Sequence, residues 1–326
     1  MRYWWVNQNQ TFAAEVQGGY IWSPKRKANK ARNQFYENMR EVSPGDRVFS
    51  FRDTLISAVS IASSHCYESP KPAEFGTAGR NWANLGWKVD VVYKIVEKPL
   101  RPKDHIESIR PLLPAKYSPL HESGDGLQSV YLAEISQELA DHLLGLLQEQ
   151  NSELDLEGLR AIAIGRASRR DADLEMIDAA IEKSLLEQPI EKTEKDQLVK
   201  ARRGQGRFRA NVAKFEKHCR ITKVADSSYL IASHIKPWRS CENYERLDGE
   251  NGLLLAPTID FLFHRGYISF ADSGALILSP VAVAETLVAL GVPVDGTITT
   301  GSFTDGQSGY LAYHRREVFL QAERAD

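Results

Sequence analysis

The chain of 326 residues has only three cysteines, Cys66, Cys219 and Cys241, and no two of them form a CxxC pair. An odd number of widely spaced cysteines is typical of a reducing compartment and argues against a structural zinc ribbon. No apolar run approaches the roughly 20 residues that a helix needs to cross a bilayer. The opening residues, MRYWWVNQNQTF, lack a charged segment followed by an apolar one, so we expect no signal peptide. These absences favour a cytoplasmic protein that has no contact with a membrane.

Charge is present in quantity but is unevenly distributed along the chain. Residues 1–105 carry 16 basic and 10 acidic side chains, residues 141–199 carry 7 and 14, and residues 200–220 carry 8 and one. Two basic regions separated by an acidic one indicate two polyanion-binding units joined by a spacer. Charge runs are also common on ordinary solvated surfaces, so charge alone leaves both interpretations open.

Residues 1–150 have the pattern of a small α+β domain. Runs rich in β-branched and aromatic residues, bounded by Gly and Pro, predict strands at RYWWV, DRVFSF, LISAVSIAS and WKVDVVYKIV. Apolar residues at helical spacing predict a helix from Ala31 to Val42, and ISQELADHLLGLLQEQ predicts a second helix. This order favours a β-barrel-like domain with a few helices.

Residues 151–199 are predicted to be a helical, acidic linker, with Asp171 as an N-cap. One face of the expected helix is apolar. Its members are Leu174, Ile177, Ile181 and Leu185. This face must pack against a neighbouring domain or a second subunit, and the sequence leaves both open. Residues 200–326 then form a third unit.

Four polar residues of this third unit lie in a strand, loop, strand and helix pattern. YLIAS predicts a strand with His234 at its end, ENYERLDGE a polar loop, and NGLLLAP a returning strand that begins with Asn251. TIDFLFHRG predicts a short helix on which Asp260 and His264 share one face. Cutting a phosphodiester requires a base that activates water and a cation that stabilises charge. A carboxylate and an imidazole one helical turn apart can share such a cation.

Each of these residues has an ordinary interpretation when it is taken alone, as a structural histidine, a turn asparagine or a solvated helix pair. Their combination is much rarer, and ASHIKPW…RLDGENGLLLAPTIDFLFHRGYISF resembles the HNH endonuclease family, the ββα-metal fold, over residues 200–285. The resemblance implies that His234 is the general base and that Asn251 orients it. It places Asp260 and His264 as metal ligands, with His264 in the catalytic set.

Two features depart from the family pattern. Ser233 stands where many members place an Asp or His ligand before the base, and the cysteine pairs of zinc-stapled members are missing. The resemblance therefore implies a divalent cation held by few side chains, with Ser233, water and phosphate oxygens completing the shell. Such a shell is typical of Mg²⁺ or Mn²⁺ and leaves other transition metals open. Arg207 and Arg209, in GQGRFRANV, are the expected phosphate contacts.

Five of the six tryptophans lie in the first domain. Trp4, Trp5 and Trp87 fall in strand patterns, and we expect them in the core. Trp22 and Trp82 lie in turn-rich, basic contexts, where a flat ring can stack on a base.

The order RYWWV…IWSP…ARNQFYENMREVSPGDRVFSF…ISAVSIAS is similar to the EVE domain, a PUA-like β-barrel, over residues 1–150. The resemblance implies a pocket that accepts a flipped, modified base. Ser23 or Asp90 would read its polar edge, and Lys25 and Arg26 would contact the DNA backbone.

A reader domain, a helical linker and an HNH nuclease together match a modification-dependent restriction endonuclease. Its expected substrate is double-stranded DNA with 5-methylcytosine or 5-hydroxymethylcytosine, as in phage DNA. Because one HNH site nicks one strand, we expect a homodimer. The alternative is a non-catalytic DNA- or RNA-binding protein with a degenerate HNH domain, which Ser233 keeps open.

Overall fold

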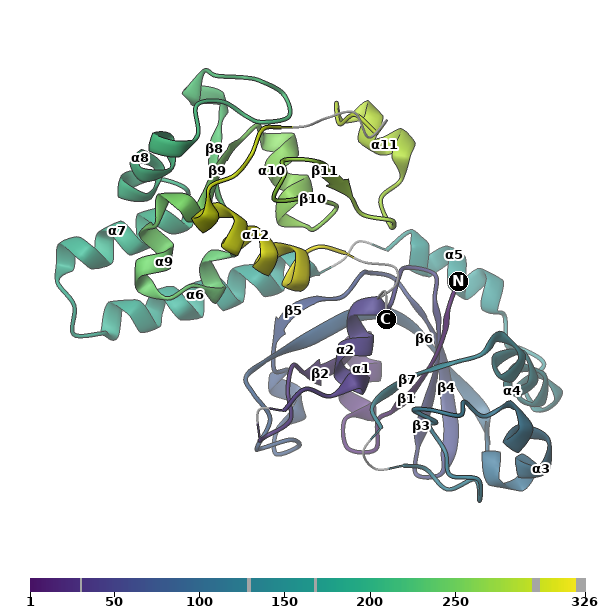
Figure 1. The fold of residues 1–326 in the computed structure, drawn as a ribbon. Coiled ribbons are helices and arrows are strands. Elements are labelled where there is room, and N and C mark those ends of the chain that lie inside the picture. The colour runs from purple at the N-terminus through teal and green to yellow at the C-terminus, as the bar shows by residue number, and fades with distance from the viewer. Residues whose placement is uncertain (30, 128–129, 167–168, 295–299, 321–326) are drawn as a thin grey trace. The chain divides into compact units, whose positions relative to one another are not determined.

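The computed structural model (Figure 1) describes the whole chain except residues 30, 128–129, 167–168, 295–299 and 321–326. The chain divides into two compact units, Met1–Met176 and Ile177–Asp326. The boundary falls inside α6 (Arg170–Glu187), so the segment predicted as a linker is shared between the two units. Among the described residues, none of the helices combines the length and apolar character needed to cross a bilayer.

A seven-stranded mixed sheet forms the centre of the first unit. Its strands are β1 (Tyr3–Asn7), β2 (Tyr20–Pro24), β3 (Arg47–Arg52), β4 (Leu55–Ala62), β5 (Tyr67–Pro70), β6 (Leu85–Leu100) and β7 (Leu132–Ile135). They follow the order β2-β6-β4-β3-β1-β7, with β5 also on β6; β1 and β3 are parallel, and the other pairs are antiparallel. The helices are α1 (Phe12–Gly18), α2 (Gln34–Glu37), α3 (Ile106–Ile109), α4 (Gln137–Gln150), α5 (Leu156–Ile164) and the start of α6.

The mixed α+β class is confirmed, but the closed barrel is not what the strand pairing shows. Closure of a barrel requires the two edge strands to pair with each other. In the described part of the chain the edge strands β2 and β7 do not pair with each other. The long strand β6 pairs with β2 and β5 along its first half and with β4 along its second. The change of partners lets the sheet bend there without closing.

Both faces of this sheet are covered, as the side-chain alternation of a strand requires. Trp4 packs with Val48 in one apolar cluster, and Trp5 packs with Phe49 in another that includes α4 side chains. Trp4, Trp5 and Trp87 are all buried, which confirms their prediction as core residues.

The second unit is mainly helical, with two small two-stranded sheets. Its elements are the rest of α6, α7 (Lys192–Arg202), α8 (Gly206–Phe215), β8 (Ile231–His234), α9 (Asn243–Leu247), β9 (Gly252–Leu255), α10 (Pro257–His264), β10 (Ile268–Phe270), β11 (Leu276–Leu278), α11 (Ala284–Ala289) and α12 (Asp305–Glu317). The predicted strand, strand and helix are therefore present as β8, β9 and α10. The segment predicted as a polar loop contains α9, whose start is a capping box formed by Glu242 and Glu245.

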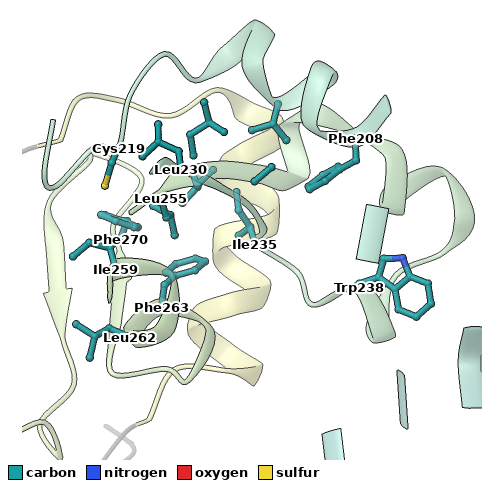
Figure 2. Packing of buried hydrophobic residues seen from close by; sticks show 14 of the residues in the cluster. Phe208, Cys219, Leu230, Ile235, Trp238, Leu255, Ile259, Leu262, Phe263 and Phe270 are labelled. Carbon is teal, nitrogen blue, oxygen red and sulfur yellow. The ribbon is translucent and has the colours of Figure 1, made fainter. Parts of the chain in front are cut away.

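A single apolar cluster holds the β8–β9 hairpin against α10 (Figure 2). Phe208 comes from α8, Leu255 from β9, Ile259 and Phe263 from α10, and Phe270 from β10. Side chains from these four segments thus fix the hairpin that carries His234 relative to the helix that carries Asp260.

Candidate functional site

His234 is the last residue of β8 and lies opposite Gly252 of β9. Its imidazole stacks on the ring of Phe208, with centroids 3.7 Å apart and an interplanar angle of 1°. Gly252 has no room for a side chain, because a Cβ there would lie 2.3 Å from a methyl of Val212 and 3.0 Å from the Phe208 ring. The glycine after Asn251 therefore lets Phe208 approach the hairpin and support the histidine.

The hydrogen bonding of His234 determines which of its nitrogens can act as a base. Nε2 lies 3.1 Å from the carbonyl oxygen of Arg246. A carbonyl only accepts, so Nε2 carries the proton and Nδ1 keeps its lone pair. Within the described residues Nδ1 has no hydrogen-bond partner. Burial lowers the pKa of His234 to about 4, which keeps the ring neutral at physiological pH.

Asn251 is fully buried and acts on the backbone around His234 instead of on the ring. Its Oδ1 accepts from the backbone N–H of Lys236 at 2.8 Å, and its Nδ2 donates to the carbonyl of Glu245 at 3.1 Å. Nδ2 also lies 3.2 Å from Sγ of Cys241. Among the described residues the Asn251 side chain makes no hydrogen bond to His234, so it can orient that histidine only through the loop that follows it.

The structure brings Ser233 and Asp260 together. Ser233 precedes His234 on β8, is buried, and donates a side-chain hydrogen bond to the Asp260 carboxylate on α10. Burial raises the pKa of Asp260, and this hydrogen bond partly opposes the shift. His264 lies one turn further along α10, at its last residue, and is exposed.

The donor set fits a cation that is held by few protein ligands. In the described part of the chain, no three His, Cys, Asp or Glu side chains converge as a metal site. Asp260 and His264 share a helix face, and the carboxylate is desolvated beside a hydroxyl, so two side chains and solvent could hold a hard divalent ion.

A cavity of about 740 Å³ opens in the first unit. Its lining includes the aromatic side chains Trp22, Tyr36, Phe51, Trp82 and Tyr131. Such a mixture of flat apolar walls and a few polar groups is typical of small-ligand sites.

Trp22 and Trp82 both line this cavity, but they lie beside one another on one wall. Their centroids are 6.1 Å apart at 29°, which is the spacing of a directly interacting aromatic pair. No base fits between the two rings in this conformation. Gly86 makes the arrangement feasible, because a Cβ there would lie 2.2 Å from the Trp22 ring.

Ser23 and Asp90 are not brought to this cavity, whose lining contains neither. Ser23 follows Trp22 on β2, so the two side chains leave opposite faces of the strand. The Asp90 carboxylate accepts from Tyr67 Oη at 2.8 Å and from the backbone N–H of Arg169 at 2.9 Å.

The polar lining that sequence reasoning missed comes from loops. Asn7 and Asn9 flank the end of β1, and Asp53 and Thr54 form the turn between β3 and β4. Asp53 and Thr54 have φ angles of 49° and 70°, a conformation that non-glycine residues seldom adopt. Two-residue hairpin turns usually carry Asn-Gly. The presence of Asp53 and Thr54 in such a turn was the sequence signal that could have pointed to this part of the lining.

The four predicted DNA-contacting cations have different surroundings. Arg207 and Arg26 are exposed. Arg209 donates to the carbonyls of Leu230 and Ser227, so its guanidinium ties a loop to α8. Lys25 pairs with Glu68 and lies 4.1 Å from the centroid of the Trp87 ring. Only the first two present cations that are free of such structural contacts.

Comparison with known proteins identifies part of the second unit. Residues 219–271, which contain His234, Asn251, Asp260 and His264, match the family described as HNH endonuclease. The second unit therefore contains an HNH endonuclease domain, a class of nucleic-acid-cutting modules that generally uses a divalent metal ion. No curated protein matches the chain.

Several solved structures resemble part of the fold at low similarity. A hypothetical protein from Leishmania major shares 11% identity, covers 46% of this chain and 96% of its own, and has a TM-score of 0.32. The YTH domain of Zygosaccharomyces rouxii MRB1, in complex with N6-methyladenosine RNA, shares 17% identity, covers 47% of this chain and 91% of its own, and has a TM-score of 0.31. Human THYN1, in complex with 5-methylcytosine-containing DNA, shares 13% identity, covers 45% of this chain and 98% of its own, and has a TM-score of 0.30. Likenesses this distant carry no argument about the present chain.

Proposed function

We propose that this protein is a modification-dependent endonuclease that cuts double-stranded DNA containing 5-methylcytosine or 5-hydroxymethylcytosine. The observation that carries the proposal is the state of His234: a buried, neutral imidazole whose Nε2 proton is engaged and whose Nδ1 is open, inside the HNH match. An imidazole with its Nε2 proton on a carbonyl and its Nδ1 unpartnered has the lone pair through which a general base takes a proton from water.

The chain's own residues supply the parts of hydrolysis. Nδ1 of His234 takes a proton from water, the oxygen attacks the phosphorus, and the bond to the leaving oxygen breaks. The Arg246 carbonyl keeps its bond to Nε2 and stabilises the imidazolium that forms. A divalent ion bound by Asp260 and His264 would supply positive charge at the scissile phosphate. Arg207 would contact the DNA backbone.

The first unit supplies the reading step in this proposal. Its aromatic-lined cavity and the similarity of residues 1–150 to EVE domains support entry of a flipped base. Trp82, half-buried with its partner Trp22 behind it, would provide the stacking surface. Asp53 lines the same cavity, and a carboxylate there can accept from the exocyclic amine of cytosine. Double-strand cleavage of phage DNA in the cytoplasm would then require two copies of the chain.

A digestion panel tests the proposal directly. Unmodified, 5-methylated, 5-hydroxymethylated and glucosylated DNA would be incubated with Mg²⁺ or Mn²⁺. We expect cleavage of the methylated or hydroxymethylated DNA only. Equal cleavage of all four would contradict the reading step, and binding without cleavage in either metal would favour the non-catalytic alternative.

The cavity assignment is tested by Trp82→Ala, with Tyr117→Ala as a control because Tyr117 is exposed and lies outside the cavity lining. Stacking on a base contributes roughly 1–3 kcal/mol, so only Trp82→Ala should lose preference for modified DNA in competition binding. Unspecific, salt-dependent binding should persist in both variants. Unchanged preference in a normally folded Trp82→Ala protein would place the base elsewhere.

A further inference from the structure

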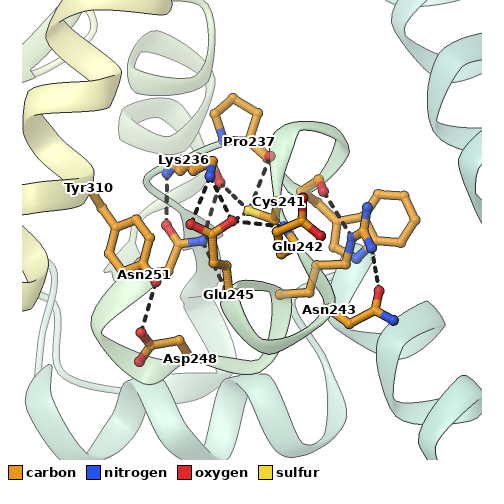
Figure 3. Close-up of polar contacts among 11 residues, drawn as sticks. Lys236, Pro237, Cys241, Glu242, Asn243, Glu245, Asp248, Asn251 and Tyr310 are labelled. Atoms are coloured by element: carbon orange, nitrogen blue, oxygen red, sulfur yellow. Dashed lines mark hydrogen bonds and ion pairs between the residues drawn. The ribbon is translucent and has the colours of Figure 1, made fainter.

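The loop between β8 and β9 contains a closed ring of contacts among Lys236, Glu245 and Asn251 (Figure 3). The Lys236 backbone N–H donates to the Asn251 side chain at 2.8 Å, and the Lys236 ammonium pairs with the Glu245 carboxylate at 2.6 and 2.7 Å. The carbonyl of Glu245 accepts from the Asn251 side chain at 3.1 Å, which completes the ring. The ring joins Lys236, two residues after His234, to Glu245, which directly precedes Arg246.

Glu245 is the member of this ring with the most contacts. One of its carboxylate oxygens also accepts from the backbone N–H of Glu242 at 2.7 Å, as part of the capping box that starts α9. Both oxygens are therefore engaged, and the side chain is largely buried. A helix of five residues such as α9 is not stable by itself, so its position depends on contacts of this kind.

The position of α9 matters because the carbonyl that fixes the His234 tautomer belongs to it. Arg246 immediately follows Glu245, and its guanidinium is held by the Trp238 carbonyl at 3.1 Å and by Asn243 at 2.6 Å. If the carbonyl of Arg246 moved, Nε2 would lose its acceptor and the imidazole could place its proton on Nδ1 instead. A ring protonated on Nδ1 has no lone pair there for water.

We propose that Glu245 is a positioning residue that sets the tautomer of His234 through α9 and the Arg246 carbonyl. Its consequence for cleavage rests on the proposed function, but its consequence for the tautomer does not. The sequence gives a matched control in Glu216, which is also buried and paired, with Arg220 at 2.6 Å. Glu216 bonds to Gln307 and Arg220, outside the Lys236–Asn251 ring.

The test measures the His234 nitrogen shifts by NMR at fixed neutral pH in the full chain without added metal. The wild type and Glu216→Ala should show a proton on Nε2, whereas Glu245→Ala should show a substantial fraction with the proton on Nδ1. Glu245→Gln keeps one acceptor for the cap and loses the ion pair, so it should lie between the two. A folded Glu245→Ala protein with the wild-type tautomer would overturn the proposal. If Glu245→Ala does not fold, Glu245→Gln decides in the same way.

Cleavage of modified DNA gives the second measurement. Loss of a correctly protonated base should slow Glu245→Ala on the order of 10²-fold, Glu245→Gln by a smaller factor, and Glu216→Ala hardly at all per folded molecule. If the wild type cuts no DNA, the proposed function fails and the tautomer still decides the role of Glu245. If the wild type cuts and Glu245→Ala cuts equally fast with an unchanged tautomer, only the present inference fails.

Discussion

Two buried histidines of the second unit have almost the same surroundings and differ at one atom. His234 stacks on Phe208 and bonds through Nε2 to the Arg246 carbonyl; His314 of α12 stacks on Phe263 at 3.9 Å and bonds through Nε2 to the Phe263 carbonyl at 2.9 Å. Nδ1 of His314, however, lies 3.0 Å from Ser269 Oγ.

The two histidines differ in what their Nδ1 atoms contact. The Ser269 hydroxyl donates to Nδ1 of His314, so both ring nitrogens of that histidine have hydrogen-bond partners. Ser233 precedes His234 on β8, so its side chain leaves the opposite face of the strand. Nδ1 of His234 has no partner among the described residues. Burial and stacking are therefore common to both histidines, and the unpartnered Nδ1 of His234 distinguishes it from His314.

The largest expected effect that tests this comparison is on cleavage. His234→Ala should lower the cleavage rate on the order of 10²–10⁴-fold, because a general base is lost, and should leave binding to modified DNA nearly unchanged. His314→Ala should lower the melting temperature but keep activity per folded molecule. Rates and binding at a temperature where both variants are folded provide the check; wild-type cleavage by His234→Ala would remove its assignment as base.

The second prediction concerns the cation near His234. Asp260→Ala and His264→Ala should each raise the Mg²⁺ or Mn²⁺ concentration needed for half-maximal cleavage about 10- to 100-fold, since ligand-shell changes of this kind weaken metal affinity by that order. Ser269→Ala, near His314, should leave the titration unchanged. Curves that coincide with wild type for both α10 variants would show that these side chains only cap or solvate the helix.

The third prediction uses the buried His314 as a pH-dependent element of stability. Burial lowers its pKa to about 3, whereas the unfolded chain takes up the proton at about 6.5. The unfolded state then binds more protons between these values, so the free energy of unfolding falls as the pH falls through this window. In denaturant unfolding between pH 4 and 6, wild type should lose about 1.4 kcal/mol more per pH unit than His314→Gln. Equal slopes would mean that His314 is hydrated in the folded protein.

The smallest expected effect separates the two serines. Ser269→Ala leaves a buried ring nitrogen without its donor and should reduce the free energy of unfolding by about 1–2 kcal/mol. Ser233→Ala frees a carboxylate on the side of a candidate cation site, and we expect less than half of that loss. Urea unfolding of the two variants gives the comparison, and equal losses would argue that the hydroxyls have equivalent structural roles.

The candidate residues that the structure brings close together as the sequence predicts are those that lie near one another along the chain. His234, Asn251, Asp260 and His264 lie in one hairpin and helix, so their order along the chain is also their order in space. Arg246 could not be found in this way, because it acts through a backbone carbonyl that every residue possesses.

The cavity of the first unit was less predictable for a related reason. Its lining joins β1, β2, the β3–β4 turn and Tyr131 near β7, which only the sheet order brings together. Trp22 lines the cavity, as its aromatic side chain in a basic segment suggested, but it lies on β2 and is almost fully buried. Ser23 was expected beside it although neighbouring strand residues face opposite ways, and Asp90 was expected although its carboxylate has partners that come from β5 and the segment before α6.

The helix α6 has a consequence for how such a protein can be assembled from exchangeable parts. Leu185 of α6 and Leu198 of α7 belong to the same apolar core as Phe208 and Phe263, whereas Asp173, earlier on α6, pairs with Lys88 of the first unit at 2.8 Å. A nuclease fragment that began at residue 200 would expose that core. Recombination that joins the second unit to a different first unit must therefore cut inside a helix, near residue 177, and preserve the register of that helix across the junction.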